Sequence, residues 1–368
     1  MDGFAACFEG LDDPRKGNAG RHDLLEMLMI ALCTVLSGGE DCTDMAEFAR
    51  VKLGFLRGFL KLEHGAPSHD TFSRLFRLLD PEPFEAAFRR FMERFAEALS
   101  GQAGLGGQTI ALDGKSLRGA VDRARRTQPL HLVTAWSAEQ RLVLGVQRAP
   151  GRSEVTAARA IIALLDLTAA TVTADALHGN RATAQAIRAR GGAYALVIKG
   201  NRGPLHRAAQ DLFANPDPAE AAITTDAAHG RHETRTAWVR PVPDWAETYR
   251  FPGLTAMARI DSLRRIGDTT ERQTRYIALS RTVEPAEALR LVRVHWSIEN
   301  NQHWLLDVAL AEDRIHTRND RTAENLALLR RLALNLLRAD TAKGSIRAKI
   351  KRAAWNDTYL LSLISQMR

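Results

Sequence analysis

Carboxylate and imidazole side chains recur at helical spacing in one segment near the end of the chain. Stepping by four residues from His295 gives Glu299, His303 and Asp307, so these side chains lie along one slowly drifting face of a predicted helix. No turn signal interrupts the segment. A helix that carries a carboxylate, two imidazoles and an amide on adjoining faces is suited to holding a metal ion or contacting a phosphate.

Two aspartates much earlier in the chain are candidate partners of Glu299. Asp113 ends the apolar strand 110–112, and Asp175 ends the apolar strand 171–174 in the same manner. Sheets with this connectivity place ligands beyond the carboxyl ends of their strands, so the two carboxylates face one point if the strands are neighbours. Either aspartate alone could equally be a turn residue or a helix cap. The two together with a helical glutamate favour a shared site.

Three converging carboxylates repel one another unless cations neutralise them, so this arrangement predicts bound metal. Oxygen ligands favour Mg²⁺ or Mn²⁺ over zinc. Two such ions, about 4 Å apart, can activate a water molecule and stabilise the leaving oxygen of a phosphodiester.

The two histidines of the helical segment allow a different interpretation, in which His295, His303 and Asp307 bind zinc. Their eight-residue separation is not the four-residue spacing of a helical zinc motif, and no cysteine lies nearby. The histidines instead orient carboxylates or contact phosphate, unless they are ordinary core residues.

Cationic side chains follow the strands and could hold a phosphate. Lys115 and Arg118 come after Asp113, and Lys199 and Arg202 come at or after the end of the predicted strand 194–199. Each of them alone is as easily a solvated surface charge.

The composition favours a polyanionic partner. Lys and Arg number 51 against 43 Asp and Glu, for a formal net charge of +8, which makes nucleic acid the leading candidate and a basic solvated surface the alternative. The segment 342–352 carries five cations and no acid, so it either tracks DNA phosphates or keeps the protein soluble.

The cysteines and the apolar stretches indicate a cytoplasmic protein. The three cysteines form no CxxC pair, which argues against a disulfide framework and against a structural zinc site. The most apolar early stretch, 24–36, contains Glu26 and is shorter than the roughly 20 residues that a membrane span needs. We therefore expect a buried helix there and no association with a membrane.

Hydrophobic periodicity changes along the chain. Apolar residues recur at three and four from 23 to 99, which predicts helices, with Ser68 or Asp70 as one helix cap. After the glycine-rich run 101–107, period-two or short apolar segments predict strands. The predicted strands are 109–113, 131–137, 141–147, 171–175 and 194–199, with helices at 153–166 and 181–190. Three strands followed by helix, strand, helix and strand is the element order of a ribonuclease-H-like mixed α/β sheet.

The remaining segments complete a five-part organisation for a chain long enough to form two or three domains. Short strands among Pro and Gly between 200 and 284 predict a β-rich insertion, and helical periodicity returns from 285. The expected parts are a helical N-terminal DNA-binding domain (1–100), the first part of a catalytic core (107–200), the β-rich insertion (201–283), the helical second part of the core (284–340) and a basic C-terminal helical tail (341–368).

These residues resemble the DDE-type (Asp-Asp-Glu) transposases of bacterial insertion sequences, specifically the ISAs group with its H-repeat-associated relatives. The resemblance covers nearly the whole chain, and the segment around Glu299 is its most specific part. The matching segments are 13–15, 21–22, 67–72, 112–115, 175–178, 295–308, 312–313 and 325–337.

The resemblance implies an activity and a set of site residues. The catalytic, metal-binding triad would be Asp113, Asp175 and Glu299, with two Mg²⁺ or Mn²⁺ ions, and the enzyme would cut double-stranded DNA at terminal inverted repeats and join the ends to target DNA. It further implies a homodimer or larger assembly on DNA and a bacterial cytoplasmic, nucleoid-associated location. The candidate DNA contacts are Lys115, Arg118, His178, Lys199, Arg202, His295, Asn300, His303, Lys349, Lys351 and Arg352.

The chain departs from the wider superfamily pattern around the glutamate. That pattern has an aromatic residue seven before it, an Arg four before it and a Lys seven after it, where this chain has Val292, His295 and Leu306. The carboxylates are intact, so we expect an active enzyme. Two alternatives stay open: a nuclease of the same fold that does not join DNA, and a DNA-binding protein whose carboxylates only form salt bridges.

Overall fold

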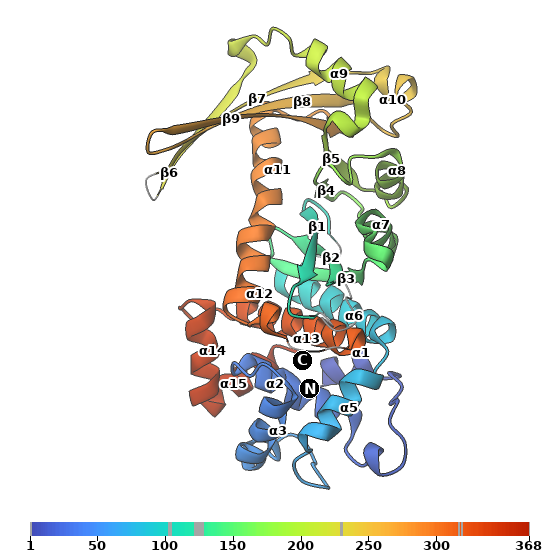
Figure 1. Cartoon of the computed structure of the whole chain (residues 1–368), viewed down its shortest axis with the longest axis vertical. Coiled ribbons are helices and arrows are strands. Elements are labelled where there is room, and N and C mark those ends of the chain that lie inside the picture. The colour runs from blue at the N-terminus through green and yellow to red at the C-terminus, as the bar shows by residue number, and fades with distance from the viewer. Residues whose placement is uncertain are drawn as a thin grey trace.

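One mixed sheet runs through the protein, as a computed structural model of residues 2–101, 105–120, 129–228, 231–315, 317 and 319–367 shows (Figure 1). The strand order is β3-β2-β1-β4-β5-β9-β8-β7-β6. The strands are β1 (Thr109–Leu117), β2 (Leu130–Ser137), β3 (Leu142–Arg148), β4 (Thr171–Ala174), β5 (Ala193–Ile198), β6 (Ala222–Ala228), β7 (Arg231–Pro241), β8 (Ala256–Ile266) and β9 (Thr269–Leu279).

Helices precede, cover and follow this sheet. Those of the first hundred residues are α1 (Asp2–Phe8), α2 (Leu24–Leu36), α3 (Cys42–Val51), α4 (Leu53–Leu56), α5 (His69–Leu78) and α6 (Pro81–Ser100). The later ones are α7 (Glu154–Leu164), α8 (Arg181–Ala189), α9 (Gly203–Leu212), α10 (Trp245–Thr248), α11 (Pro285–Ile298), α12 (Trp304–Val308), α13 (Asp320–Ala339), α14 (Ile346–Trp355) and α15 (Asp357–Ser365). In the described part of the chain, none of them combines the length and the apolar character needed to cross a bilayer.

The first five strands confirm the predicted mixed α/β arrangement. Strand β1 pairs antiparallel with β2 and parallel with β4, and β4 pairs parallel with β5. Every residue of β4 is buried, as expected for a short parallel strand covered on both faces. Strands β2 to β5 begin and end within one residue of the predicted limits.

The prediction that Asp113 ends its strand is wrong. Strand β1 continues to Leu117, because its pairing with β2 extends from Ile110 opposite Ser137 to Leu117 opposite Leu130. Only the parallel pairing with β4 stops just before Asp113.

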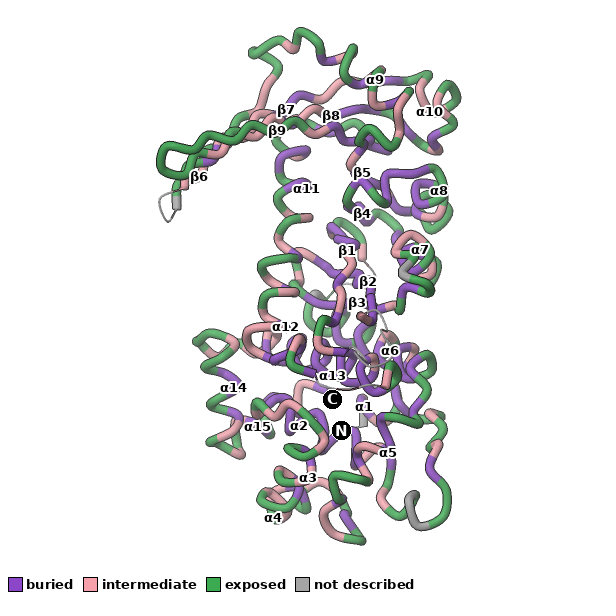
Figure 2. The backbone as a smooth tube through the Cα atoms, in the orientation of Figure 1, coloured by how far each residue is buried: buried purple, intermediate pink, exposed green. Residues whose placement is uncertain are grey.

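The β-rich segment extends the same sheet, because β9 pairs antiparallel with β5. Strands β6 to β9 form a long ribbon whose far end is exposed, whereas its base near β5 is buried (Figure 2). Helix α11 runs from this ribbon towards the helices around α13 and packs against β1, β4 and β7 on the way (Figure 1).

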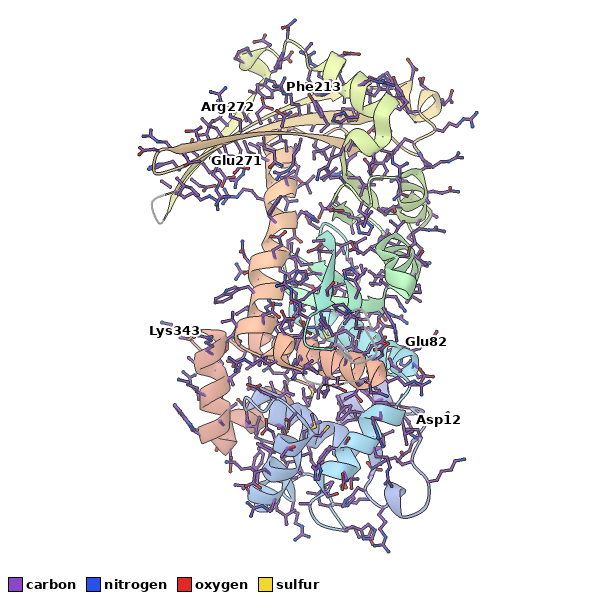
Figure 3. All side chains as sticks on the ribbon, in the orientation of Figure 1. Asp12, Glu82, Phe213, Glu271, Arg272 and Lys343 are labelled. Atoms are coloured by element: carbon purple, nitrogen blue, oxygen red, sulfur yellow. The ribbon has the colours of Figure 1, made fainter. Side chains whose placement is uncertain are left out.

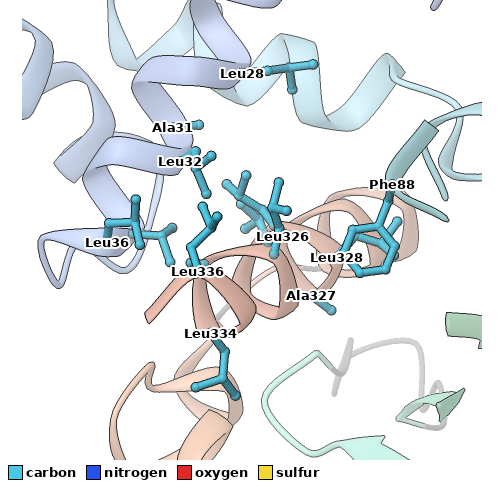
Figure 4. Packing of buried hydrophobic residues seen from close by; sticks show 14 of the residues in the cluster. Leu28, Ala31, Leu32, Leu36, Phe88, Leu326, Ala327, Leu328, Leu334 and Leu336 are labelled. Carbon is cyan, nitrogen blue, oxygen red and sulfur yellow. The ribbon is translucent and has the colours of Figure 1, made fainter. Parts of the chain in front are cut away.

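The N-terminal helices share their core with the C-terminal ones. Leu32 and Leu36 of α2 lie against Leu326 and Leu336 of α13 in one buried cluster (Figure 4). The same cluster includes apolar residues of β1, β2 and β3. The five-part division of the chain therefore stays a prediction. Of the two candidate caps, Ser68 is the one at the start of α5, where its side chain accepts from the Thr71 N–H.

A buried ion network fastens β1 to the C-terminal helices. Lys115 Nζ lies 2.6 Å from Asp307 Oδ1 and 3.0 Å from Glu312 Oε2, and Glu312 also pairs with Arg331. The side chains of Glu312 and Arg331 are fully buried. Burial alone would raise the pKa of Glu312, but the charges of Arg331 and Lys115 outweigh it and lower that pKa. The network therefore stays ionised in the core.

Removing one member of this network should destabilise the fold. Replacing Arg331 by Met leaves the buried Glu312 carboxylate short of a partner, so the free energy of unfolding should fall by about 3 to 5 kcal/mol. Urea unfolding measures this loss. Arg321→Met, at an exposed position of the same helix, is the matched control and should change the stability by less than about 1 kcal/mol. Equal losses in the two variants would contradict the role given to the network.

Candidate active site

The three carboxylates proposed from the sequence line one cavity. Asp113, Asp175 and Glu299 border a space of about 230 Å³ together with His295 and Lys199. The parallel pairing of β1 and β4 ends with Leu112 opposite Ala174, so each aspartate is the next residue on its own segment. The sheet register thus explains why residues 62 positions apart in the sequence reach the same cavity.

A local irregularity of the helix places Glu299. The segment 299–303 forms a π-helical turn between α11 and α12, in which the Trp304 N–H bonds to the Glu299 carbonyl. Such a turn inserts one extra residue and rotates the side chains that follow it. The single regular helix predicted through 295–307 is therefore wrong at its centre.

The cavity carries an excess of negative charge. Burial and the carboxylates of Glu299, Asp175 and Glu154 raise the pKa of Asp113 to about 7, and a hydrogen bond from the Gly114 N–H opposes this rise. Carboxylate oxygens and uncompensated charge are suited to a hard divalent cation. Among the described residues, however, no three His, Cys, Asp or Glu side chains gather closely enough to hold a single ion. The carboxylates fit such ions by donor type and charge, and they surround a common space.

Two histidines lie beside the site. His303 Nδ1 is 3.5 Å from Asp113 Oδ2, and His295 Nδ1 is 3.5 Å from Thr173 Oγ1, one of the groups that line the cavity. Burial is the main cause that lowers the pKa of each ring to about 4. Both rings are therefore uncharged at pH 7, which favours the interpretation that they orient side chains. They approach different groups of the protein, His303 a carboxylate and His295 a threonine hydroxyl.

Of the two cations predicted after Asp113, only Lys115 has surroundings that differ from what we expected. Lys115 is buried, and its ammonium group contacts three carboxylates, so it is neutralised inside the protein and does not face the cavity. Arg118 is exposed, and its backbone N–H bonds to Asp313. Lys115 is not accessible to a phosphate in this structure.

The cations after β5 lie closer to the site. Lys199 is exposed and lines the same cavity as the three carboxylates. Arg202 is partly buried, and its Nε donates to the Gly179 carbonyl. Asn300 is exposed next to Glu299 and borders a second cavity.

Four further candidate contacts separate into buried and exposed groups. His178 is 1% exposed, so its ring is not on the surface. Lys349 is also buried, and its Nζ donates to the carbonyls of Leu337 and Asp340. Lys351 and Arg352 on α14 are exposed.

A larger basic cavity adjoins the first one, and we did not predict it from the sequence. Its volume is about 720 Å³, and it shares Gln273, Arg275, Trp296 and Glu299 with the smaller cavity. The Arg275 guanidinium lies 4.9 Å from the centre of the Trp296 ring, which is 44% exposed. The other arginines around it are Arg231, Arg235, Arg264 and Arg293. Alternation along the ribbon predicts a polar face here, but only the packing of α11 against the ribbon brings that face to Glu299.

Comparisons with known proteins give a consistent result. The family described as "Transposase DDE domain" matches residues 104–336, and the associated family "DDE_Tnp_1-associated" matches residues 5–92. The chain is 31% identical over 357 residues to the "H repeat-associated putative transposase YhhI" of Escherichia coli K12, covering 94% of this chain and 93% of that protein. It is 30% identical over 366 residues to the "Putative transposase YncI" of Escherichia coli O157:H7, covering 96% and 92%.

A Xanthobacter autotrophicus protein shows higher identity over a shorter match. This "Uncharacterized protein in dhlA 3'region" is 39% identical over 287 residues, which cover 76% of this chain and 94% of that protein.

The charge of Asp113 should make stability depend on pH in the absence of divalent cations. Its pKa is raised from 3.8 to about 7, so the folded chain keeps a proton that the unfolded chain loses, and the free energy of unfolding falls as pH rises through this window. Asp113→Asn removes that cost. At pH 8 with a chelator, the variant should be more stable than the parent by on the order of 1 to 3 kcal/mol, allowing for partial exposure of the carboxyl group.

Urea unfolding at pH 4 and pH 8 measures this difference, which should nearly vanish at pH 4. The exposed Asp12→Asn serves as the matched control and should show no such pH dependence. A pH-independent effect of Asp113→Asn would contradict the raised pKa.

Proposed function

The chain belongs to the DDE transposase family, and from this membership we propose that it is the transposase of a bacterial insertion sequence. It binds the terminal inverted repeats of double-stranded DNA, hydrolyses phosphodiester bonds at the ends of the element and joins those ends to target DNA. The observation that supports this most is the shared cavity of Asp113, Asp175 and Glu299, which come from three separate segments.

The carboxylates would hold the divalent cations of the reaction. Asp113, Asp175 and Glu299 offer oxygen donors and the negative charge for two Mg²⁺ or Mn²⁺ ions, which when bound lower the pKa of a water molecule and stabilise the leaving oxygen of a phosphodiester. His303 faces Asp113 and orients its carboxyl group, while the uncharged His295 ring lines the wall next to Asp175. The exposed Lys199 faces the same space and contacts the phosphate backbone.

The basic cavity beside Glu299 receives the DNA strand that leads into the site. Arg264, Arg275 and Arg293 border it, and Asn300 adds a hydrogen-bonding side chain. Arginine is suited to contacting phosphate oxygens, and such contacts position a duplex without reading its sequence. Arg293 also pairs with Asp226 on β6, so the ribbon and α11 are joined at the wall of this cavity.

The exposed cations of α14 form a second DNA contact. Lys351 and Arg352 are exposed on this helix. Lys343, which precedes the helix by three residues, is labelled in Figure 3. Of the residues first considered as DNA contacts, Lys115, His178 and Lys349 are assigned structural roles instead. Joining two element ends requires two protomers, so we propose a homodimer or larger assembly on DNA, in the cytoplasm and associated with the nucleoid.

Substitution of the three carboxylates should abolish cleavage but leave DNA binding intact. Asp113→Asn, Asp175→Asn and Glu299→Gln keep the size of each side chain and remove its charge. Losing several kcal/mol of transition-state stabilisation should slow Mg²⁺-dependent cleavage of labelled end DNA by about 1,000-fold or more. Gel-shift affinity should stay within about twofold, because these side chains contact the cation and not the backbone.

The exposed Asp12→Asn is again the control and should cleave like the parent. The DNA flanking the reading frame supplies the inverted repeats for the substrate, and integration into a supercoiled plasmid measures joining. Cleavage without joining would identify a nuclease. DNA binding that ignores Mg²⁺, with no cleavage by the parent, would identify a DNA-binding protein without catalytic activity.

Two lysines of α14 should have different effects on DNA binding. Lys351 is exposed, so Lys351→Ala should reduce the slope of log affinity against log salt concentration by about one. Lys349 is buried and its Nζ lies 3.2 Å from Asp340 Oδ2, so Lys349→Ala should lower the thermal unfolding midpoint and leave the slope unchanged. A reversed pattern would show that Lys349 is the residue that contacts DNA.

A further inference from the structure

A fourth carboxylate lies behind the strand that carries Asp113. Glu154 is the first residue of α7, and its Oε1 lies 2.7 Å from His131 Nε2 on β2. Its Oε2 lies 3.7 Å from His178 Nε2. Ser116 Oγ lies 2.8 Å from the other ring nitrogen of His131, so His131 is held from both sides. We call Glu154, His131 and His178 the brace.

The brace occupies the space that a side chain at position 114 would fill. A Cβ atom added to Gly114 would lie 2.6 Å from His131 Nε2 and 2.7 Å from the Glu154 carboxyl carbon, closer than real Cβ atoms approach other groups. Glycine at this position is therefore what allows Glu154 and His131 to lie directly against β1.

The brace lies on the face of the sheet opposite to the cavity. Successive residues of a strand point to opposite faces, so Asp113 and Gly114 face opposite sides of β1. Asp113 faces His303, whereas Leu112, on the same side as Gly114, packs in the core cluster that includes Ala157 of α7. Glu154 is accordingly not among the residues that line the cavity of the three carboxylates. Glu154 is therefore placed to support β1 and not to bind a metal ion in the cavity.

The brace joins the two aspartate-bearing segments where the backbone pairing between them has ended. The last pair of the β1 and β4 ladder is Leu112 with Ala174, one residue before each aspartate. The turn after Asp175 bends back on itself, because the Leu177 N–H bonds to Asp175 Oδ1 and the His178 N–H to the Asp175 carbonyl. His178 thus moves with Asp175, and through Glu154 it is tied to His131.

We propose that Glu154 is a positioning residue of the active site, which sets the distance and orientation of Asp113 relative to Asp175 through His131 and His178. This rests on the proposed transposase function. The two histidines are 8% and 1% exposed, so the contacts are shielded from solvent. The close contacts of His131 and then His178 with the carboxylate also lower the pKa of Glu154 to about 2, so its charge is retained across the physiological range.

Hydrogen exchange tests the brace without any need for activity. Glu154→Gln keeps the shape of the side chain and removes the charge that binds both rings. The backbone amides of 175–180 and 113–117 should exchange at least tenfold faster than in the parent chain, because the side-chain link between them through Glu154 is weakened. Glu63→Gln, at an exposed position in the turn between α4 and α5, is the matched control and should leave both segments unchanged.

Catalysis gives the second readout. If the aspartates are displaced by even about 1 Å, cleavage should slow on the order of 100-fold in Glu154→Gln, with the affinity for end DNA unchanged. His178→Asn should slow it as well, and the double variant should be no slower than the worse single variant, because both changes break one link. Gly114→Ala, which pushes the brace away without altering any charge, should reproduce the loss of cleavage rate.

The outcomes separate this inference from the proposed function. Unchanged hydrogen exchange in Glu154→Gln, or purely additive effects in the double variant, would contradict the positioning role of Glu154, whether or not the protein cleaves DNA. If the parent does not cleave DNA while exchange changes as expected, the transposase proposal fails and the brace stands. If Glu154→Gln does not fold, the exchange comparison is made on His178→Asn, which removes the contact between Glu154 and His178 and leaves the contact with His131.

Discussion

The ionised form of Asp113 is the constraint on which the arrangement of this protein depends. Burial and the neighbouring carboxylates raise its pKa to about 7, so the isolated site resists the charge that its proposed chemistry needs. The cost can be tolerated only if the surrounding structure is stable enough to hold the carboxylates together in the absence of cations. The rest of the fold supplies that stability on both faces of β1.

The two supports of β1 are electrostatic but differ in kind. On the face of Asp113, Lys115 reaches into a buried network with Asp307 and Glu312 that continues to Arg331 on α13. This network anchors the strand to the same helical segment that carries Glu299. On the other face, the absence of a side chain at Gly114 leaves room for Glu154 and His131 to lie directly against the strand. One support sets the distance from β1 to the helix, and the other sets the distance from β1 to the turn after β4.

The local features of the fold were predictable from the sequence, whereas the partners of buried charges were not. Strands β2 to β5 and helix α2 follow directly from apolar periodicity, which is a property of neighbouring residues. The burial of Lys115 depends on Asp307 and Glu312, nearly 200 positions away, so a Lys two residues after Asp113 suggested a phosphate clamp instead. The same holds for His178, whose motif position suggested DNA but whose ring lies beside Glu154.

Irregular backbone explains the other differences. A π turn adds a single residue to a helix, which hardly changes the spacing of apolar residues, so 295–307 looked like one regular face. Likewise, Asp113 looked like the end of a strand because polar residues follow it, although pairing with β2 carries β1 four residues further. In both cases the deviation lies next to a site carboxylate. Sequence rules that describe regular elements are least informative where an element is adapted to a site.

The positions of the arginines relate the basic composition of the chain to the geometry of the site around Glu299. Many of them are paired: Arg331 with Glu312 in the core, Arg290 with Glu287 on α11, and Arg259 with Asp261 on the ribbon. Around the larger cavity the arginines outnumber the acids, and Arg275 lies against an aromatic ring beside Glu299. The arginines that line this cavity exceed its acids by two, although Arg231, Arg235 and Arg293 also pair with Glu233 or Asp226. Positive charge therefore lies beside a negatively charged cavity. A phosphodiester strand that lies across both cavities would neutralise the arginines, and the divalent cations would neutralise the carboxylates.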